Sequence, residues 1–325
     1  MEGNELLRIE QLFKYYPVKP PNPWAKETYL RAVDGVSLYL RQGETLGIVG
    51  ESGCGKSTLG QCILMLQQPT GGRVWFEGTE LTGRSEGVLR PLRGRMQMIF
   101  QDPYSSLDPR WTVRKILSEP LRGRERAQVR RRVEDLIRMV GLEPDCLERY
   151  PHQFSGGQRQ RIGIARAFAA DPQLVLCDEA VSALDVSIQA QIINLLQDLQ
   201  EQTGVSYLFI SHDLSVVRHI SDRIMVLYLG RVVEEGTREQ IFRDPRHPYT
   251  QLLIQAVPHP DPEQPMAEQP PAGDFPSPMA LPRGCRFQSR CPFFDPACCA
   301  AEPELRKVAP GHRCACHRKE EAFHV

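Results

Sequence analysis

The sequence has no apolar run that could cross a membrane. No stretch of its 325 residues approaches the roughly 18 consecutive apolar residues that a transmembrane helix needs. The first ten residues carry three acidic side chains, Glu2, Glu5 and Glu10, where a signal peptide would be basic and then apolar. We therefore expect a chain without a membrane span that stays in the compartment where it is made.

A net charge of either sign is also missing. Lysine plus arginine number 40, and aspartate plus glutamate number 40, so there is no global field to attract nucleic acid. This balance argues against a nucleic-acid partner.

The ten cysteines are not distributed like those of a secreted disulfide scaffold. Four are scattered, at Cys54, Cys62, Cys146 and Cys177, and six crowd between Cys285 and Cys316. We expect a reducing cytoplasm and a local metal site.

Short apolar runs alternate with helical patterns along most of the chain. Strand-like runs occupy 32–40, 44–49, 174–177, 207–210 and 224–229, and helical patterns occupy 59–66, 124–140 and 187–202. This alternation predicts an α/β fold with a mostly parallel sheet. The charge-rich stretch from about 103 to 160 predicts an inserted helical subdomain.

The chain is expected to divide into three parts. Residues 1–257 form the main domain. Residues 258–282 hold nine prolines and predict a linker, and residues 283–325 form a cysteine-rich C-terminal extension with a metal site.

A phosphate-binding loop follows the apolar run at 44–49. Gly50-Glu-Ser-Gly-Cys-Gly-Lys-Ser57 fits the P-loop pattern, in which backbone amides and a helix N-terminus surround phosphate oxygens. Lys56 should bridge the β- and γ-phosphates of ATP, and Ser57 should bind Mg²⁺. The expected nucleotide contacts here are Gly50, Ser52, Gly53, Cys54, Gly55, Lys56, Ser57 and Thr58.

Two carboxylates end the apolar run at 174–177, where an α/β sheet presents its ligands. Asp178 suits the Mg²⁺ shell, and Glu179 can polarise a water for in-line attack. A P-loop kinase or GTPase would share these features.

A second anion-binding helix start lies at Phe154-Ser-Gly-Gly-Gln-Arg-Gln-Arg161. The P-loop already accounts for its own nucleotide, so this segment makes sense if it faces a nucleotide held by another subunit. Its expected contacts are Ser155, Gly156, Gly157 and Gln158.

Over residues 7–257 the sequence resembles the ATP-binding cassette (ABC) family, whose signature motif matches this segment. The resemblance implies a P-loop NTPase cassette with a RecA-like core, an antiparallel β part and an inserted helical subdomain. It also implies that two cassettes pair head to tail around two ATP molecules.

Further matches to the family fall in the expected order. They imply that Gln101 contacts Mg²⁺ or water, that Asp185 lies at the dimer seam, and that His212 contacts the γ-phosphate. An aromatic side chain should stack on adenine, and we favour Tyr16 over Tyr15. Because the chain keeps Glu179, we expect a hydrolytically competent site completed by a partner's signature serine.

Within the family, Phe100-Gln-Asp-Pro-Tyr-Ser-Ser-Leu-Asp-Pro109, His247-Pro-Tyr-Thr-Gln-Leu-Leu253 and the C-terminal extension resemble the dipeptide/oligopeptide/nickel importer branch. This resemblance implies a peripheral subunit on the cytoplasmic face of the cell membrane. Its partners would be a paralogous cassette, two permease subunits and an external binding protein. A homodimer stays as the alternative to the paralogue.

Thiols at Cys285, Cys291, Cys298 and Cys316 are spaced by six, seven and eighteen residues, wider than in a zinc finger. Spacing alone does not choose between Zn²⁺ and an iron–sulfur cluster. The extension resembles the cysteine-bearing C-terminal region of that branch, in which a [4Fe–4S] cluster is bound, and on this resemblance we favour the cluster over zinc. Either Cys299 or Cys314 could replace a neighbouring ligand.

Other functions compete with a peptide importer. Nickel and haem are alternative cargoes. A soluble ABC ATPase acting on nucleic acid or ribosomes would carry two cassettes or a coiled-coil insertion, which are not seen here. A metal-dependent regulator and an exporter are the remaining alternatives.

Overall fold

The computed structural model describes residues 5–19, 28–102, 106–257, 277, 279 and 281–318. The chain divides into two compact units, both discontinuous in sequence. We call Met1–Leu6, Leu40–Thr45 and Gly83–Ser211 the helix-rich unit, and Leu7–Tyr39, Leu46–Thr82 and His212–Val325 the sheet-rich unit. In the described ranges, no helix is both long and apolar enough to span a bilayer.

Three parallel strands form the sheet of the helix-rich unit. Strand β7 (Leu174–Asp178) pairs with β6 (Met96–Ile99) on one side and with β8 (Ser206–Ser211) on the other. Every residue of β7 and β8 is buried, which explains the apolar runs 174–177 and 207–210 within them. The strands expected at 174–177 and 207–210 are confirmed.

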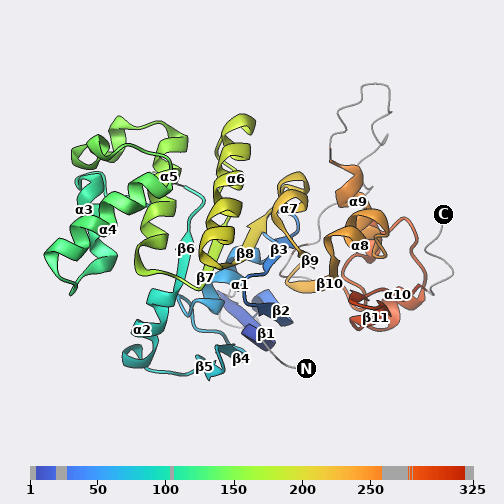
Figure 1. Ribbon diagram of the computed structural model, residues 1–325. Coiled ribbons are helices and arrows are strands. Elements are labelled where there is room, and N and C mark those ends of the chain that lie inside the picture. The colour runs from blue at the N-terminus through green and yellow to red at the C-terminus, as the bar shows by residue number, and fades with distance from the viewer. Residues whose placement is uncertain are drawn as a thin grey trace, which may run out of the picture. The chain divides into compact units, whose positions relative to one another are not determined.

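Helices make up most of the remainder of this unit. Helices α3 (Val113–Ser118), α4 (Arg126–Met139) and α5 (Gly156–Ala167) pack against one another, as Figure 1 shows. Helix α4 buries one apolar face and exposes most of its charged side chains, as the helical pattern at 124–140 predicts. The other helical elements are α2 (Glu86–Arg95), α6 (Val186–Thr203), η1 (Glu119–Leu121), η2 (Pro144–Glu148), η3 (Pro151–Gln153) and η4 (Phe168–Ala170).

The sheet-rich unit contains a four-stranded antiparallel sheet in the order β2-β1-β4-β5. Its long strands are β1 (Glu5–Val18) and β2 (Thr28–Arg41), and the shorter ones are β4 (Gly71–Phe76) and β5 (Thr79–Glu80). The antiparallel part expected from the family resemblance is therefore confirmed.

A second group of strands in this unit supports the P-loop. Strand β3 (Thr45–Val49) pairs in parallel with β9 (Arg223–Tyr228), which pairs antiparallel with β10 (Arg231–Thr237). The apolar runs predicted at 44–49 and 224–229 are these strands. The accompanying helices are α1 (Lys56–Ile63), α7 (Leu214–Ile220), α8 (Arg238–Arg243) and α9 (Pro248–Gln255).

The cysteine-rich segment, defined here as residues 281–318, extends this group of strands. Its hairpin of β11 (Arg306–Ala309) and β12 (His312–Cys314) pairs with β10, where Cys314 lies opposite Glu234. The segment also contains η5 (Gln288–Arg290) and α10 (Ala297–Ala300). This attachment was not predicted from the sequence.

The domain boundaries stay predictions. Most of the linker expected at 258–282 lies outside the described residues, as do residues 103–105 at the expected start of the helical subdomain. The α/β class, with parallel strands and an antiparallel sheet, is confirmed.

Candidate nucleotide site

The P-loop connects β3 to helix α1, as the sequence predicts. Gly55 is the N-cap of α1 and has a φ of 107°. A Cβ atom on Gly55 would lie 1.9 Å from the carbonyl oxygen of Ala32, and one on Gly50 would lie 2.2 Å from that of Leu227. Only glycine fits at these two positions, because neighbouring backbone occupies the space of a side chain.

Lys56 is buried within this loop, with 4 % of its surface exposed. Its ammonium group donates hydrogen bonds to the carbonyl oxygens of Gly50, at 2.7 Å, and of Glu51, at 3.0 Å. A buried positive charge is thereby held inside the loop. This is the position from which a P-loop lysine reaches phosphate oxygens.

The other predicted residues of the loop differ in exposure. Ser52 and Gly53 are exposed, whereas Ser57 and Thr58 are half-buried at the start of α1. Burial raises the pKa of the Cys54 thiol, which therefore stays protonated. A neutral buried thiol fits a packing role better than a role in chemistry.

Side chains distant in sequence brace the loop at Glu51. The Glu51 backbone N–H donates to the Tyr249 hydroxyl at 2.8 Å. Arg290 donates from both terminal nitrogens to the two carboxylate oxygens of Glu51, each at 2.8 Å. Neither Tyr249 nor Arg290 was predicted from the sequence to contact the P-loop. The motif His247-Pro-Tyr-Thr, which contains Tyr249, indicated only a resemblance to the importer branch. No local pattern indicated that Arg290 reaches the loop.

In the helix-rich unit, two predicted residues are brought together at the end of β7. The amide Nε2 of Gln101 donates to the Glu179 carboxylate at 2.9 Å. Asp178 is buried with 8 % exposure, and Glu179 is half-buried. An amide and two carboxylates thus gather where β7 ends.

Glu179 has an unusual backbone conformation. Its φ is +48°, which non-glycine residues seldom adopt, and its N–H donates to the Ile210 carbonyl at 3.0 Å. Such strain is often found at functional positions, where the surrounding structure maintains it.

The predicted signature lies at the start of α5. Ser155 is the N-cap, and its hydroxyl accepts from the Gln158 N–H at 3.3 Å while the Gln158 side chain accepts from the Ser155 N–H at 3.1 Å. Both side chains are exposed. A Cβ on Gly157 would lie 2.6 Å from Ile188, so this glycine allows close packing, and Gly156 is only half-buried.

The remaining predicted residues lie on separate elements. Asp185 is the exposed N-cap of α6, and His212 is exposed in the turn before α7. Tyr16, on β1, donates its hydroxyl hydrogen to Gln67, with Lys14 over its ring at 5.0 Å. The hydroxyl of Tyr15 donates to Asp34, and burial followed by this hydrogen bond raises the pKa of Tyr15 to about 12.

The four predicted cysteine ligands occupy one neighbourhood. The Cys285 N–H donates to the Cys298 carbonyl at 2.7 Å. Burial raises the pKa of Cys285 to about 12, and Cys298, Cys316 and Cys291 add to this rise. Among the described residues, however, no group of three or more His, Cys, Asp or Glu side chains is placed to hold a metal ion.

The two alternative ligands have other partners. Cys299 is exposed, and its thiol donates to the Gln288 side-chain oxygen at 2.8 Å. Cys314 is buried in β12, and burial, followed by the charges of Glu234 and Cys316, raises its pKa.

Two regions of the chain match known families. Residues 33–182 match the family described as "ABC transporter", and residues 233–298 match "Oligopeptide/dipeptide transporter, C-terminal region". The matches contain the P-loop, the signature and three of the four predicted cysteine ligands.

Several proteins resemble the chain over nearly its full length. The oligopeptide transport ATP-binding protein OppF of Escherichia coli is 51% identical over 94% of this chain and 94% of its own length. AppF of Bacillus subtilis is 49% identical, covering 96% of this chain and 97% of its own, and the dipeptide protein DppF of E. coli is 48% identical, covering 96% and 93%.

Solved structures show the same fold. CbiO1 of Clostridium perfringens, part of an ABC transporter complex, has a TM-score of 0.64 at 26% identity, covering 74% of this chain and 91% of its own. An ATP-binding cassette dimer bound to ADP and Pi has a TM-score of 0.63 at 30% identity, covering 71% and 98%. The chain therefore belongs to the ABC transporter family, as an ATP-binding protein of the oligopeptide/dipeptide type.

Proposed function

We propose that this chain hydrolyses ATP to drive the import of peptides through a membrane transporter. Two observations carry the proposal. The chain is 48% to 51% identical, over nearly its full length, to oligopeptide and dipeptide transport proteins, and its P-loop is intact. ATP-binding subunits of this type are ATPases coupled to transport. The C-terminal match at 233–298 favours peptides over nickel or haem as cargo.

The P-loop would bind the phosphates of ATP. Backbone amides from Gly50 to Thr58 and the ammonium group of Lys56 supply positive potential, and Lys56 would exchange its loop carbonyls for phosphate oxygens. Tyr16 would stack on adenine.

Hydrolysis would depend on the carboxylates at the end of β7. Glu179 would accept a proton from the attacking water, and Gln101, its hydrogen-bond partner, would fix the direction of the carboxylate. The hydroxyl of Ser57 and the carboxylate of Asp178 are oxygen donors that suit Mg²⁺, which would neutralise phosphate charge. His212 would contact the γ-phosphate.

The signature would serve a nucleotide held by a second cassette. Ser155 and Gln158 are exposed at the N-terminus of a twelve-residue helix, as a surface offered to another molecule requires. Asp185 would lie near the same seam. We propose a paralogous cassette as this partner, with a homodimer as the alternative, and two permease subunits and an external binding protein completing a machine at the cytoplasmic membrane face.

We also propose that Cys285, Cys291, Cys298 and Cys316 bind a [4Fe–4S] cluster, with Zn²⁺ as the alternative. Their mutual effect on thiol pKa supports a shared neighbourhood. No group of three or more such side chains among the described residues is placed to hold a metal ion, so the proposal rests on the cysteine spacing and on this shared neighbourhood. Bound metal would supply a covalent cross-link that orders the segment.

Uptake assays test the proposed function. Cells lacking this gene should lose uptake of labelled di- or oligopeptides, and wild-type protein but not Glu179→Gln should restore it. Unchanged peptide uptake with lost nickel or haem uptake would assign the other cargo.

Iron, acid-labile sulfide and zinc measured in anaerobically purified protein test the proposed metal site. The absence of all three would refute the proposal that these cysteines bind a cluster or zinc.

A further inference from the structure

We propose that Arg290, in the cysteine-rich segment, is a positioning residue for nucleotide binding that neutralises Glu51 inside the P-loop. The inference rests on the function proposed above, because it concerns the affinity of that loop for ATP. By this inference the cysteine-rich segment, which follows the expected linker, belongs to the nucleotide site.

The contact has the geometry of a strong charged pair. Both terminal nitrogens of Arg290 donate to Glu51, one to each carboxylate oxygen, at 2.8 Å. Only 10 % of the Arg290 side chain and 31 % of the Glu51 side chain are exposed. A two-pronged, partly buried pair loses little strength to solvent screening.

The charge of Glu51 explains why such a partner is needed. A P-loop collects positive potential for a polyanion, and a carboxylate within the loop opposes that purpose. Lys56 donates to the Glu51 carbonyl and does not pair with its carboxylate in the contacts described. Arg290 supplies the compensating charge from outside the loop.

An aromatic cluster fixes the part of the chain that carries Arg290. Phe287, three residues earlier, is buried with 1 % exposure and packs on Tyr228 and Tyr249, with ring centroids 5.3 and 5.4 Å away. The hydroxyl of Tyr249 accepts the Glu51 N–H. One cluster therefore holds both the backbone of Glu51 and the segment that neutralises its side chain.

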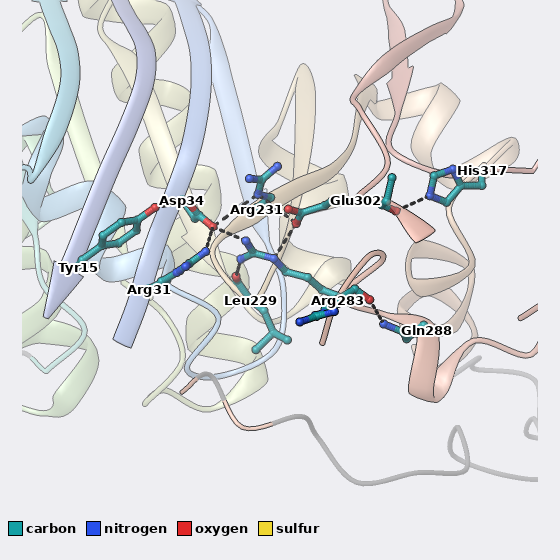
Figure 2. A network of polar contacts seen from close by, with 11 residues as sticks. Tyr15, Arg31, Asp34, Leu229, Arg231, Arg283, Gln288, Glu302 and His317 are labelled. Carbon is teal, nitrogen blue, oxygen red and sulfur yellow. Dashed lines mark hydrogen bonds and ion pairs between the residues drawn. The ribbon is translucent and has the colours of Figure 1, made fainter. Parts of the chain in front are cut away.

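A second buried pair anchors the same segment. Arg286 donates to Asp34, to the Leu229 carbonyl and, at 2.8 Å, to Glu302. Figure 2 shows this network, in which Tyr15, Arg31 and Arg231 also approach Asp34. Because these contacts do not involve the P-loop, the segment should stay docked when Arg290 is replaced.

The chain provides a matched control. Arg313 in β12 pairs with Glu235 of β10 at 2.6 Å, and so it also joins the segment to the rest of the unit by a charged pair. It has no described contact with the P-loop. Arg313→Ala should remove a similar attachment without exposing a charge in the nucleotide site.

The test is MgATP affinity of the full chain by isothermal titration calorimetry, with thermal unfolding recorded for each variant. Arg290→Ala should weaken binding about tenfold, the usual scale for a lost charged hydrogen-bonded pair. Arg290→Lys should fall between it and the wild type, because lysine restores charge without the fork. Glu51→Gln in the Arg290→Ala background should restore affinity, and Arg313→Ala should leave it unchanged.

The outcomes separate this inference from the proposed function. If the wild-type chain fails to bind MgATP, the function proposed for the P-loop is wrong. If the wild type binds and Arg290→Ala binds equally well, the role of Arg290 is refuted. Equal weakening by Arg313→Ala, or no recovery with Glu51→Gln, would also refute it, because general docking of the segment would then explain the loss.

Discussion

The P-loop and the signature are both helix starts rich in glycine, but the chain supports them differently. Three parts of the chain support the P-loop. Strand backbone lies close to Gly50 and Gly55, and side chains of α9 and of the cysteine-rich segment form hydrogen bonds with Glu51. The signature serine is exposed and engaged with Gln158 of its own helix. The P-loop is thus preorganised within this chain, while the signature serine is presented at the surface, as its proposed action on a partner's nucleotide requires.

The largest effect is expected from a substitution that stops ATP hydrolysis and leaves the residues of both helix starts unchanged. Glu179→Gln should reduce ATP hydrolysis by the assembled transporter by about a hundredfold or more, because the proposed general base is lost, while leaving MgATP affinity of the chain unchanged. Steady-state phosphate release and calorimetry provide the two measurements.

Glu143→Gln is the matched control, since it neutralises an exposed carboxylate elsewhere in the helix-rich unit. It should hydrolyse ATP like the wild type. Normal turnover in Glu179→Gln would remove this residue from the mechanism.

A change at Gly55 should break the preorganised side of the comparison. Gly55→Ala places a methyl group 1.9 Å from the Ala32 carbonyl oxygen, and should cost on the order of 3 kcal/mol of unfolding free energy together with ATP binding. Gly53 also has a positive φ, but a Cβ there would have no atom within 4 Å. Gly53→Ala should therefore lose much less unfolding free energy than Gly55→Ala. Urea unfolding of both variants decides, and equal losses would mean that φ alone matters.

Acid should weaken the support of the P-loop through His247, the N-cap of α9. Burial, only partly opposed by Glu234, lowers the pKa of His247 from 6.5 to about 4. Between these values the unfolded chain binds a proton that the folded chain does not, so stability falls as the pH falls. We expect a loss of about 2 kcal/mol between pH 7 and pH 5 from this residue.

His247→Asn isolates this contribution, because asparagine keeps an N-cap acceptor for the Tyr249 N–H and does not titrate. Urea unfolding at both pH values should show a smaller acid loss in the variant by about that amount. An identical pH dependence in the two proteins would exclude His247 as the cause.

The smallest effect on the isolated chain is expected at the signature. Ser155→Ala removes the N-cap of α5 and should cost about 1 kcal/mol of stability, as should Thr237→Ala at the equivalent capping box of α8. If the signature acts on a partner's nucleotide, only Ser155→Ala should also reduce ATPase activity of the assembled transporter. Equal activity in the two variants would reduce Ser155 to a helix cap.

The sequence predicted features that depend on local pattern. Glycine spacing, an apolar strand ending in two carboxylates and a serine with glutamine three residues later each specify local geometry, and all three lie on the predicted elements. The hydrogen bond between Gln101 and Glu179 was not predicted, because the family resemblance implied only that Gln101 contacts Mg²⁺ or water, and the two residues are 78 positions apart.

Contacts at long range were not predictable in this way. Arg290 lies 239 residues from Glu51, and nothing in Cys-Arg-Phe-Gln-Ser-Arg-Cys indicates an acidic partner in the P-loop. The same holds for β12, a strand of three residues whose partner β10 precedes the linker. Such pairings bring together residues that are far apart in the sequence. Local residue patterns carry little information about which distant segments meet.

The pairing of β12 with β10 also bears on solubility. A strand without a neighbour exposes a row of N–H and C=O groups to which another chain can add. The C-terminal hairpin covers β10 and leaves β11 at the end of the strand order, four residues long and carrying Arg306 and Lys307. Short, basic edges resist such addition, so we expect the hairpin to reduce aggregation through β10.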